Sequence, residues 1–134
     1  DRDVTGVQTC ALPISGIYDR KSVENVERPQ LRRHFISRDD GRFEVRPHIK
    51  DLVKFRQHDL MSGVPISRYL DIVTCRNVTI YFTEKQKNEL VQVFHSALVT
   101  DGYYIMGKTE YLGREVEHLF APYNIIHKIL QKAE

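Results

Sequence analysis

The sequence predicts an α/β domain with a parallel sheet of the doubly wound type. An apolar run at residues 70–75 has the length of a buried strand. A helical pattern follows it, and residues 103–107 then form a second strand pattern. Strand, helix and strand at this spacing make a βαβ unit, which sets the two strands parallel. Ligands of such sheets bind beyond the carboxyl ends of the strands, so the residues after each strand are the candidate site.

The helix between these strands has the clearest local signals. Thr83 and Gln86 have the spacing of a capping box. Asp101-Gly102 is expected to end the helix, because glycine tolerates a positive φ. The apolar residues at helical spacing are Leu90, Val91, Phe94, Ala97 and Leu98.

The remaining elements are predicted from shorter patterns. Pro29 suits the first turn of a helix that runs through Phe35 and Ile36. Asp40-Gly41 predicts a turn, and residues 43–47 then alternate as a short exposed strand. The apolar residues from 49 onward predict a second strand that ends at "QHDL", residues 57–60, and residues 62–68 predict a loop. Residues 124–132 predict a final strand.

Composition excludes several classes of function. No window is long and apolar enough to cross a bilayer, and no secretory leader pattern is present, so we expect a cytoplasmic protein. Cys10 and Cys75 have no metal-site spacing, so no metal is expected. No glycine fingerprint, nucleophile elbow or basic-aromatic nucleic-acid platform occurs. Residues 16–58 carry 11 basic against 7 acidic side chains, which fits an acidic partner or a solvated mixed-charge face.

Three polar clusters follow the predicted strands and are expected to share one edge of the sheet. They are His58-Asp59, Arg76-Asn77 and the run from Gly107 to Glu110. Each has a structural alternative. Asp59 can cap a loop, His58 can be structural, and Asn77 can be a turn residue. In the same way, Tyr81 can be a core residue and Glu110 a helix-start carboxylate.

Four stretches resemble the CheR family of chemotaxis receptor methyltransferases: "LDIVTCRNVTIYF", "DGYYIMGKTE", "LVKFRQHDLM" and "LRRHFISRDDGRFEVRPHIKDLV". The resemblance covers residues 16–134. It implies the C-terminal half of a Rossmann-like S-adenosylmethionine-dependent methyltransferase sheet, with a small inserted β-subdomain at residues 33–55 that faces receptors.

The resemblance also implies the chemistry. S-adenosylmethionine donates the methyl group, and the acceptors are glutamate side chains on cytoplasmic helices of methyl-accepting chemotaxis receptors. Asp59, Leu60, Arg76 and Asn77 match family residues that contact the cofactor, and Tyr81 matches the aromatic residue near the transferred methyl. The family reads "GHSE" where this chain reads "GKTE", so no role is carried over to the two middle positions. A monomer is expected, with no nucleic-acid partner and no membrane insertion.

The first residues are expected to be foreign to the domain. Residues 4–15, "VTGVQTCALPIS", resemble a translated sequencing adapter, so residues 1–15 are interpreted as an artefactual tail. The family's glycine-containing first strand would then precede residue 16, and the chain alone is expected to be inactive. Two other functions stay open: a non-catalytic methyltransferase-like module that docks receptors or signalling partners, and an unrelated Rossmann-like oxidoreductase.

Overall fold

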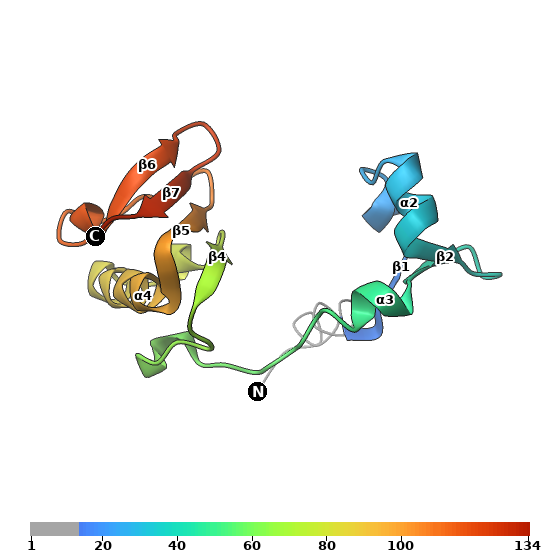
Figure 1. Cartoon of the computed structure of the whole chain (residues 1–134), viewed down its shortest axis with the longest axis horizontal. Coiled ribbons are helices and arrows are strands. Elements are labelled where there is room, and N and C mark those ends of the chain that lie inside the picture. Colours follow the sequence, from blue (N-terminus) through green and yellow to red (C-terminus); the bar gives the residue numbers. More distant parts are fainter. Residues whose placement is uncertain (1–13) are drawn as a thin grey trace. The chain divides into compact units, whose positions relative to one another are not determined.

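The computed structural model describes residues 14–134, and the chain divides into two compact units between Gln57 and His58. Figure 1 shows the elements of both units along the chain. Residues 1–13, which include Cys10 and most of the adapter-like segment, lie outside the described residues.

The first unit is built on a small antiparallel sheet with the strand order β1-β3-β2. The hairpin between β2 and β3 closes at the predicted turn, where Gly41 has a φ of 81° and its N–H donates to the carbonyl of Arg38 at 3.0 Å. The sheet includes β1, which lies upstream of residues 33–55. The elements are β1 (Ile17–Tyr18), η1 (Lys21–Val23), α2 (Arg28–His34), β2 (Phe35–Ser37), β3 (Phe43–Val45) and α3 (Pro47–Lys50).

Three predictions for this unit are wrong. The predicted helix ends at His34, and Phe35 and Ile36 belong to β2, where Phe35 pairs with Val45. Pro47 begins α3 and does not extend the strand, because its fixed φ suits the first turn of a helix. The strand predicted to end at residues 57–60 is absent, since residues 53–59 form no regular element.

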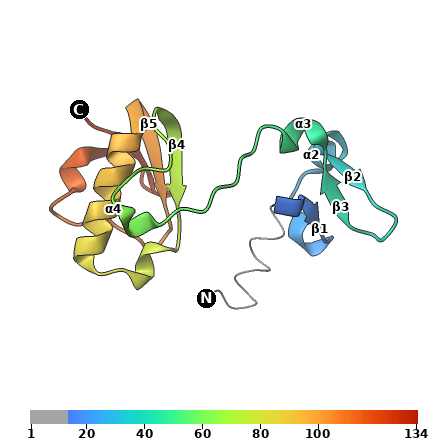
Figure 2. The ribbon, with the colours of Figure 1, turned by 90° about the horizontal axis from the view of Figure 1, so that it is seen from below.

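The second unit is a helix packed on a four-stranded mixed sheet with the order β4-β5-β7-β6. Figure 2 shows α4 beside β4 and β5. The first two strands are parallel and joined through α4, which confirms the α/β class and the βαβ unit; the other pairings are antiparallel. The elements are η2 (Leu60–Ser62), β4 (Leu70–Cys75), η3 (Thr79–Tyr81), α4 (Glu84–Ala97), β5 (Leu98–Met106), η4 (Glu117–Leu119), β6 (Phe120–Asn124) and β7 (Ile129–Lys132). Among residues 14–134, none of the helices has the length and apolar character needed to cross a membrane.

The core of this unit lies between α4 and the sheet. The capping box is present: the Thr83 hydroxyl accepts from Gln86 N–H at 3.2 Å, and the Gln86 side chain accepts from Thr83 N–H at 2.9 Å. The predicted apolar face of α4 is buried, and the ring of Phe94 lies 5.2 Å from that of Tyr104 on β5. The helix is therefore fixed at its start by local hydrogen bonds and along its length by packing.

Other predictions for the second unit need correction. α4 ends at Ala97, and Asp101-Gly102 lies within β5, where a register shift places extra residues opposite β4. β4 is not buried on both faces, since Ile72 is 55% exposed. Residues 124–132 form no single strand: β6 ends at Asn124, a turn follows, and β7 begins at Ile129.

Candidate functional site

The carboxyl ends of β4 and β5 lie side by side in the second unit. Cys75 and Met106, the last residues of the two strands, pair in register. Directly after them, the Nε of Arg76 donates to the Met106 carbonyl at 3.2 Å. The structure therefore brings together two of the three predicted polar clusters, those at residues 76–77 and 107–110.

Glu110 connects these two strand ends. Its Oε1 accepts from the N–H groups of Asn77 at 2.8 Å and Gly107 at 2.7 Å. Its Oε2 accepts from the N–H of Thr79 at 3.2 Å and from the Thr79 hydroxyl. Glu110 is 6% exposed, so this carboxylate is a buried acceptor for donors of both turns. The alternative that it begins a helix is wrong, because residues 107–111 contain a turn and no helix.

The surroundings of Glu110 change three pKa values. Burial raises the pKa of Glu110, but hydrogen bonds from Thr79, Asn77 and Gly107 lower it by more, so the carboxyl stays below its usual range. Burial, with the Glu110 charge adding to it, raises the pKa of Cys75 to about 11. Burial is also the main cause that raises the pKa of Tyr104. Cys75 and Tyr104 are therefore neutral at pH 7, and Glu110 is the charged group among these three.

Asn77 adopts a left-handed backbone conformation, with a φ of 62°. This conformation confirms its structural alternative as a turn residue, since asparagine tolerates positive φ better than most residues. The carboxamide is nevertheless exposed at the strand end, and its Oδ1 lies close to Gly107. Both a turn role and a binding role are therefore compatible with its position.

Tyr81 ends η3, the short helix that leads from the β4 exit toward α4. Its side chain is 83% exposed, so the alternative that it is a core residue is wrong. Thr79 is buried two residues earlier, and Ile80 between them is 54% exposed. In the segment that follows β4, the Thr79 side chain therefore points inward to Glu110, whereas the side chains of Ile80 and Tyr81 are exposed.

Asp59 and Leu60 lie at the start of η2, where Asp59 is the N-cap and Leu60 the first residue. Asp59 caps η2 by accepting from Met61 N–H at 2.9 Å, which matches its structural alternative. His58 is also structural: its Nε2 donates to the Val64 carbonyl at 2.9 Å. No hydrogen bond within residues 14–134 joins Asp59 or Leu60 to Arg76 or Asn77. The prediction that a strand ends at this cluster is therefore wrong, because the structure has no strand between α3 and η2. The cofactor contacts of Asp59 and Leu60 stay a prediction.

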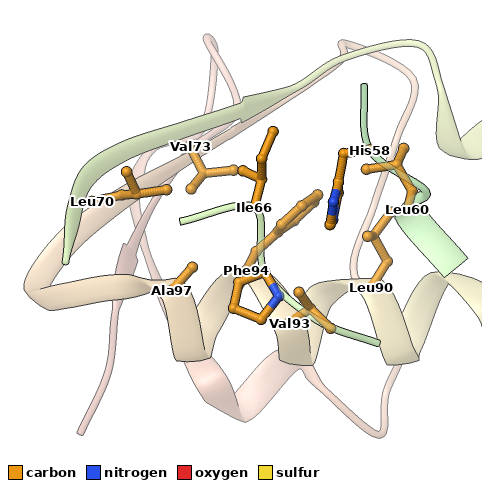
Figure 3. A pocket seen from close by; sticks show the side chains of 10 residues that line it. His58, Leu60, Ile66, Leu70, Val73, Leu90, Val93, Phe94 and Ala97 are labelled. Carbon is orange, nitrogen blue, oxygen red and sulfur yellow. The ribbon is translucent and has the colours of Figure 1, made fainter. Parts of the chain in front are cut away.

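A small apolar cavity of about 60 Å³ lies between α4, β4 and the 58–66 segment. Figure 3 shows the side chains of Leu60, Phe94 and His58 around it. Its lining is apolar except for His58, whose Nε2 already donates to the Val64 carbonyl, so it holds no charged group that would orient a charged ligand. We therefore interpret it as a packing defect beneath the 58–66 segment, apart from the polar strand ends.

The sequence model described as "CheR methyltransferase, SAM binding domain" matches residues 10–129, most of the chain. The chain belongs to this family. A "Chemotaxis protein methyltransferase" of Vibrio parahaemolyticus is 35% identical over 99 residues, which cover 73% of this chain and 36% of the relative. "Chemotaxis protein methyltransferase Cher2" of Pseudomonas putida is 33% identical over 105 residues, covering 78% of this chain and 38% of the relative.

A third relative is much larger than the others. An "Uncharacterized 104.1 kDa protein in hypE 3'region" of Rhodobacter capsulatus is 30% identical over 131 residues, covering 98% of this chain and 13% of that protein. The chain spans somewhat more than a third of the length of the two chemotaxis methyltransferases. Membership of the CheR family favours the methyltransferase interpretation over the oxidoreductase alternative.

The strand ends fit part of a binding site for S-adenosylmethionine, the ligand named in the family description. The terminal nitrogens of Arg76 make no hydrogen bond within the described part of the chain, and the Asn77 carboxamide is exposed beside them. A guanidinium and a carboxamide are suitable partners for the carboxylate and hydroxyl groups of such a ligand. Reasoning from the sequence missed the pairing of Thr79 with Glu110, although both residues lie inside the motifs that carried the family resemblance.

Proposed function

We propose that this chain is part of an enzyme that methylates glutamate side chains of chemotaxis receptors, with S-adenosylmethionine as the donor. The family match over residues 10–129 carries the proposal. The convergence of Arg76, Asn77 and Glu110 at the ends of two parallel strands supports it, since this is where ligands of such sheets bind. Asp59 and Leu60 are proposed as further cofactor contacts, and Tyr81 as the residue near the methyl group.

The reaction that we propose needs no general base. A glutamate carboxylate has a reference pKa of about 4.3, so it is already ionised at neutral pH. Its oxygen attacks the methyl carbon while the carbon–sulfur bond breaks, which gives a methyl ester and a neutral thioether. The task of the protein is to align donor and acceptor, which is worth roughly 7 to 11 kcal/mol in favourable cases. A site of fixed turns and exposed side chains suits this task.

The acceptor that we propose is a glutamate-rich helix of a receptor in the cytoplasm. The charges of the small unit support an acidic partner. Arg38, Arg42 and Lys50 are paired within the unit, where they form ion pairs with Asp40 and Glu44 at 2.7 to 2.9 Å. The arginines of α2 and the residue before α3 form no ion pair with any described residue. These are Arg28, Arg32, Arg33 and Arg46.

A methyl-transfer assay tests the proposed reaction. The protein translated from the complete gene is incubated with radiolabelled S-adenosylmethionine and receptor-containing membranes. We expect label on the receptor that is released as methanol by mild alkali, because esters hydrolyse there and N-methyl groups do not. The 134-residue chain alone is expected to transfer none, because it contains no glycine fingerprint for the donor. Alkali-stable label on the receptor would contradict the glutamate assignment.

A second experiment separates catalysis from docking and tests the partner. If the protein of the complete gene binds receptor membranes but not S-adenosylmethionine, the non-catalytic docking alternative is correct.

Arg32→Gln and Arg33→Gln are expected to weaken binding to receptor-containing membranes several-fold at low salt. Arg42→Gln is the matched control, because Asp40 already engages its charge. Equal effects of all three substitutions would contradict the proposed docking surface.

A further inference from the structure

The Glu110 carboxylate accepts four hydrogen bonds, which occupy both of its oxygens. Three backbone N–H groups and one hydroxyl point at its two oxygens, one pair to each oxygen. Two of the donor residues, Asn77 and Thr79, lie more than 30 positions earlier in the chain. A charged carboxylate satisfies such a site better than any neutral side chain, because it is purely an acceptor.

These hydrogen bonds determine which side chains of residues 76–81, the segment that follows β4, are exposed. They hold Thr79 inward at 6% exposure and fix the backbone of Asn77, whose φ is 62°. With those two residues fixed, the neighbouring Arg76, Asn77 and Tyr81 side chains are all exposed. The exposed residues are those proposed to contact the donor, whereas Glu110 itself is buried beneath them.

Lys128 ties the same turn to the rest of the sheet. Its Nζ donates to the Glu110 carbonyl at 2.8 Å, and its own carbonyl accepts from Met106 N–H at 3.0 Å. The backbone of Glu110 is therefore anchored to β5 and the β6–β7 hairpin. Because the backbone of Glu110 is anchored, its carboxylate keeps a fixed position. The hydrogen bonds to that carboxylate then fix the segment that follows β4.

We propose that Glu110 is a positioning residue for the methyl-transfer site, acting through Asn77 and Thr79 to orient the side chains of residues 76–81. This inference rests on the proposed function. Glu110 holds the turn while the exposed side chains contact the donor. The consequence is that donor affinity depends on a buried residue that the donor does not touch.

The test uses the protein of the complete gene and two substitutions of different severity. Glu110→Gln places an NH₂ group against one pair of donors and leaves at least one backbone N–H unpaired. Thr79→Val removes only the hydroxyl and keeps the N–H donor. Affinity for S-adenosylmethionine is measured by calorimetry well below each melting temperature. We expect Kd to rise about tenfold for Glu110→Gln and less for Thr79→Val. Glu89→Gln, an exposed acid on α4, is the control and leaves Kd unchanged.

The outcomes separate this inference from the proposed function. If the wild type binds S-adenosylmethionine and both variants bind it equally well while melting at lower temperature, Glu110 is structural only and the positioning role is overturned. If the wild type does not bind S-adenosylmethionine, the proposed function itself is overturned. Should Glu110→Gln fail to fold, the Kd of Thr79→Val decides, since that change removes a single hydrogen bond.

Discussion

Gly107 and Asn77 lie in contact at the ends of two neighbouring strands. A methyl group added to Gly107 would lie 2.5 Å from Asn77 Oδ1 and 2.5 Å from Glu110 Oε1. Glu110 is held by four hydrogen bonds, and the backbone nitrogen of Asn77, which is fixed in its turn, would also lie only 3.0 Å from the added methyl group. The absence of a side chain at residue 107 is therefore a condition for the two turns to approach each other.

Gly107→Ala is predicted to destabilise the protein. The added methyl group must displace both oxygens, and overpacking of this kind costs roughly 1 to 3 kcal/mol. A thermal melting curve measures the loss. Lys108→Ala is the control in the same turn, because Lys108 is exposed and its truncation should leave the melting temperature nearly unchanged. A melting temperature for Gly107→Ala that equals the wild type would contradict the close approach.

Two substitutions at Asn77 separate its turn role from its proposed binding role. Asn77→Ala removes the carboxamide and strains a backbone with positive φ, whereas Asn77→Gly removes the carboxamide without strain. Both should weaken S-adenosylmethionine binding in the complete protein, by roughly 1 to 3 kcal/mol, because a ligand group loses its partner. Only Asn77→Ala should also lower the melting temperature. Lys108→Ala should weaken donor binding less than either change, and unchanged affinity in Asn77→Gly would leave Asn77 as a turn residue alone.

Tyr81→Phe is predicted to lower turnover and leave stability unchanged. The ring is 83% exposed, so loss of its hydroxyl removes no buried hydrogen bond. Because Tyr81 is proposed to lie close to the methyl group, loss of its hydroxyl should lower kcat more than it changes the Kd for the donor. Tyr69, which is 85% exposed, provides the matched control Tyr69→Phe. Equal turnover in the two variants and the wild type would remove Tyr81 from the proposed site.

Acid is predicted to weaken the second unit through Glu110. Its pKa lies below the usual 4.5 in the folded protein, so the folded state favours the ionised form. The resulting stabilisation is complete above pH 4.5 and disappears as the pH falls through the folded-state pKa. Melting curves between pH 7 and pH 3 should show the wild type approaching Glu110→Gln as the pH drops. A constant difference between the two proteins over this range would contradict the prediction.

The cavity of about 60 Å³ beside α4 is predicted to accept one more methyl group. Val93 lines it, and Val93→Ile should raise stability by up to about 0.8 kcal/mol, the value of one buried methylene. Val64→Ile, at a position that is 59% exposed, is the control and should change little. Destabilisation by Val93→Ile in denaturant titrations would mean that the cavity walls cannot admit the added group.

The sequence alone predicts those elements whose signals lie in neighbouring residues. The strand at residues 70–75 and the start of α4 follow from an apolar run and a capping box, and the structure contains both. Local signals failed at Asp101-Gly102, because a residue pair suited to positive φ can end a helix or form an irregularity within a strand. They failed again at Phe35, which has helical spacing but pairs with Val45 across a hairpin.

The candidate site shows the same division between local and distant interactions. Arg76 and Asn77 were found because they follow a recognisable strand. The contact of Glu110 with Asn77 joins residues 33 positions apart, and no local pattern encodes such a contact. An apolar pattern predicts a strand end at His58 and Asp59, but residues 53–59 form no regular element and Asp59 caps η2. Positions that depend on tertiary contacts required the structure.

The segment between Cys75 and Thr83 is tethered at both ends, and this has an evolutionary consequence. Glu110 fixes residues 77 and 79, and the capping box fixes residue 83, so only three residues connect the two anchors. One inserted or deleted residue would break an anchor, whereas exchange of an exposed side chain would break neither. We therefore expect natural variation here to alter the identity of the exposed residues and to preserve their number, so that the length of the segment is inherited more strictly than its composition.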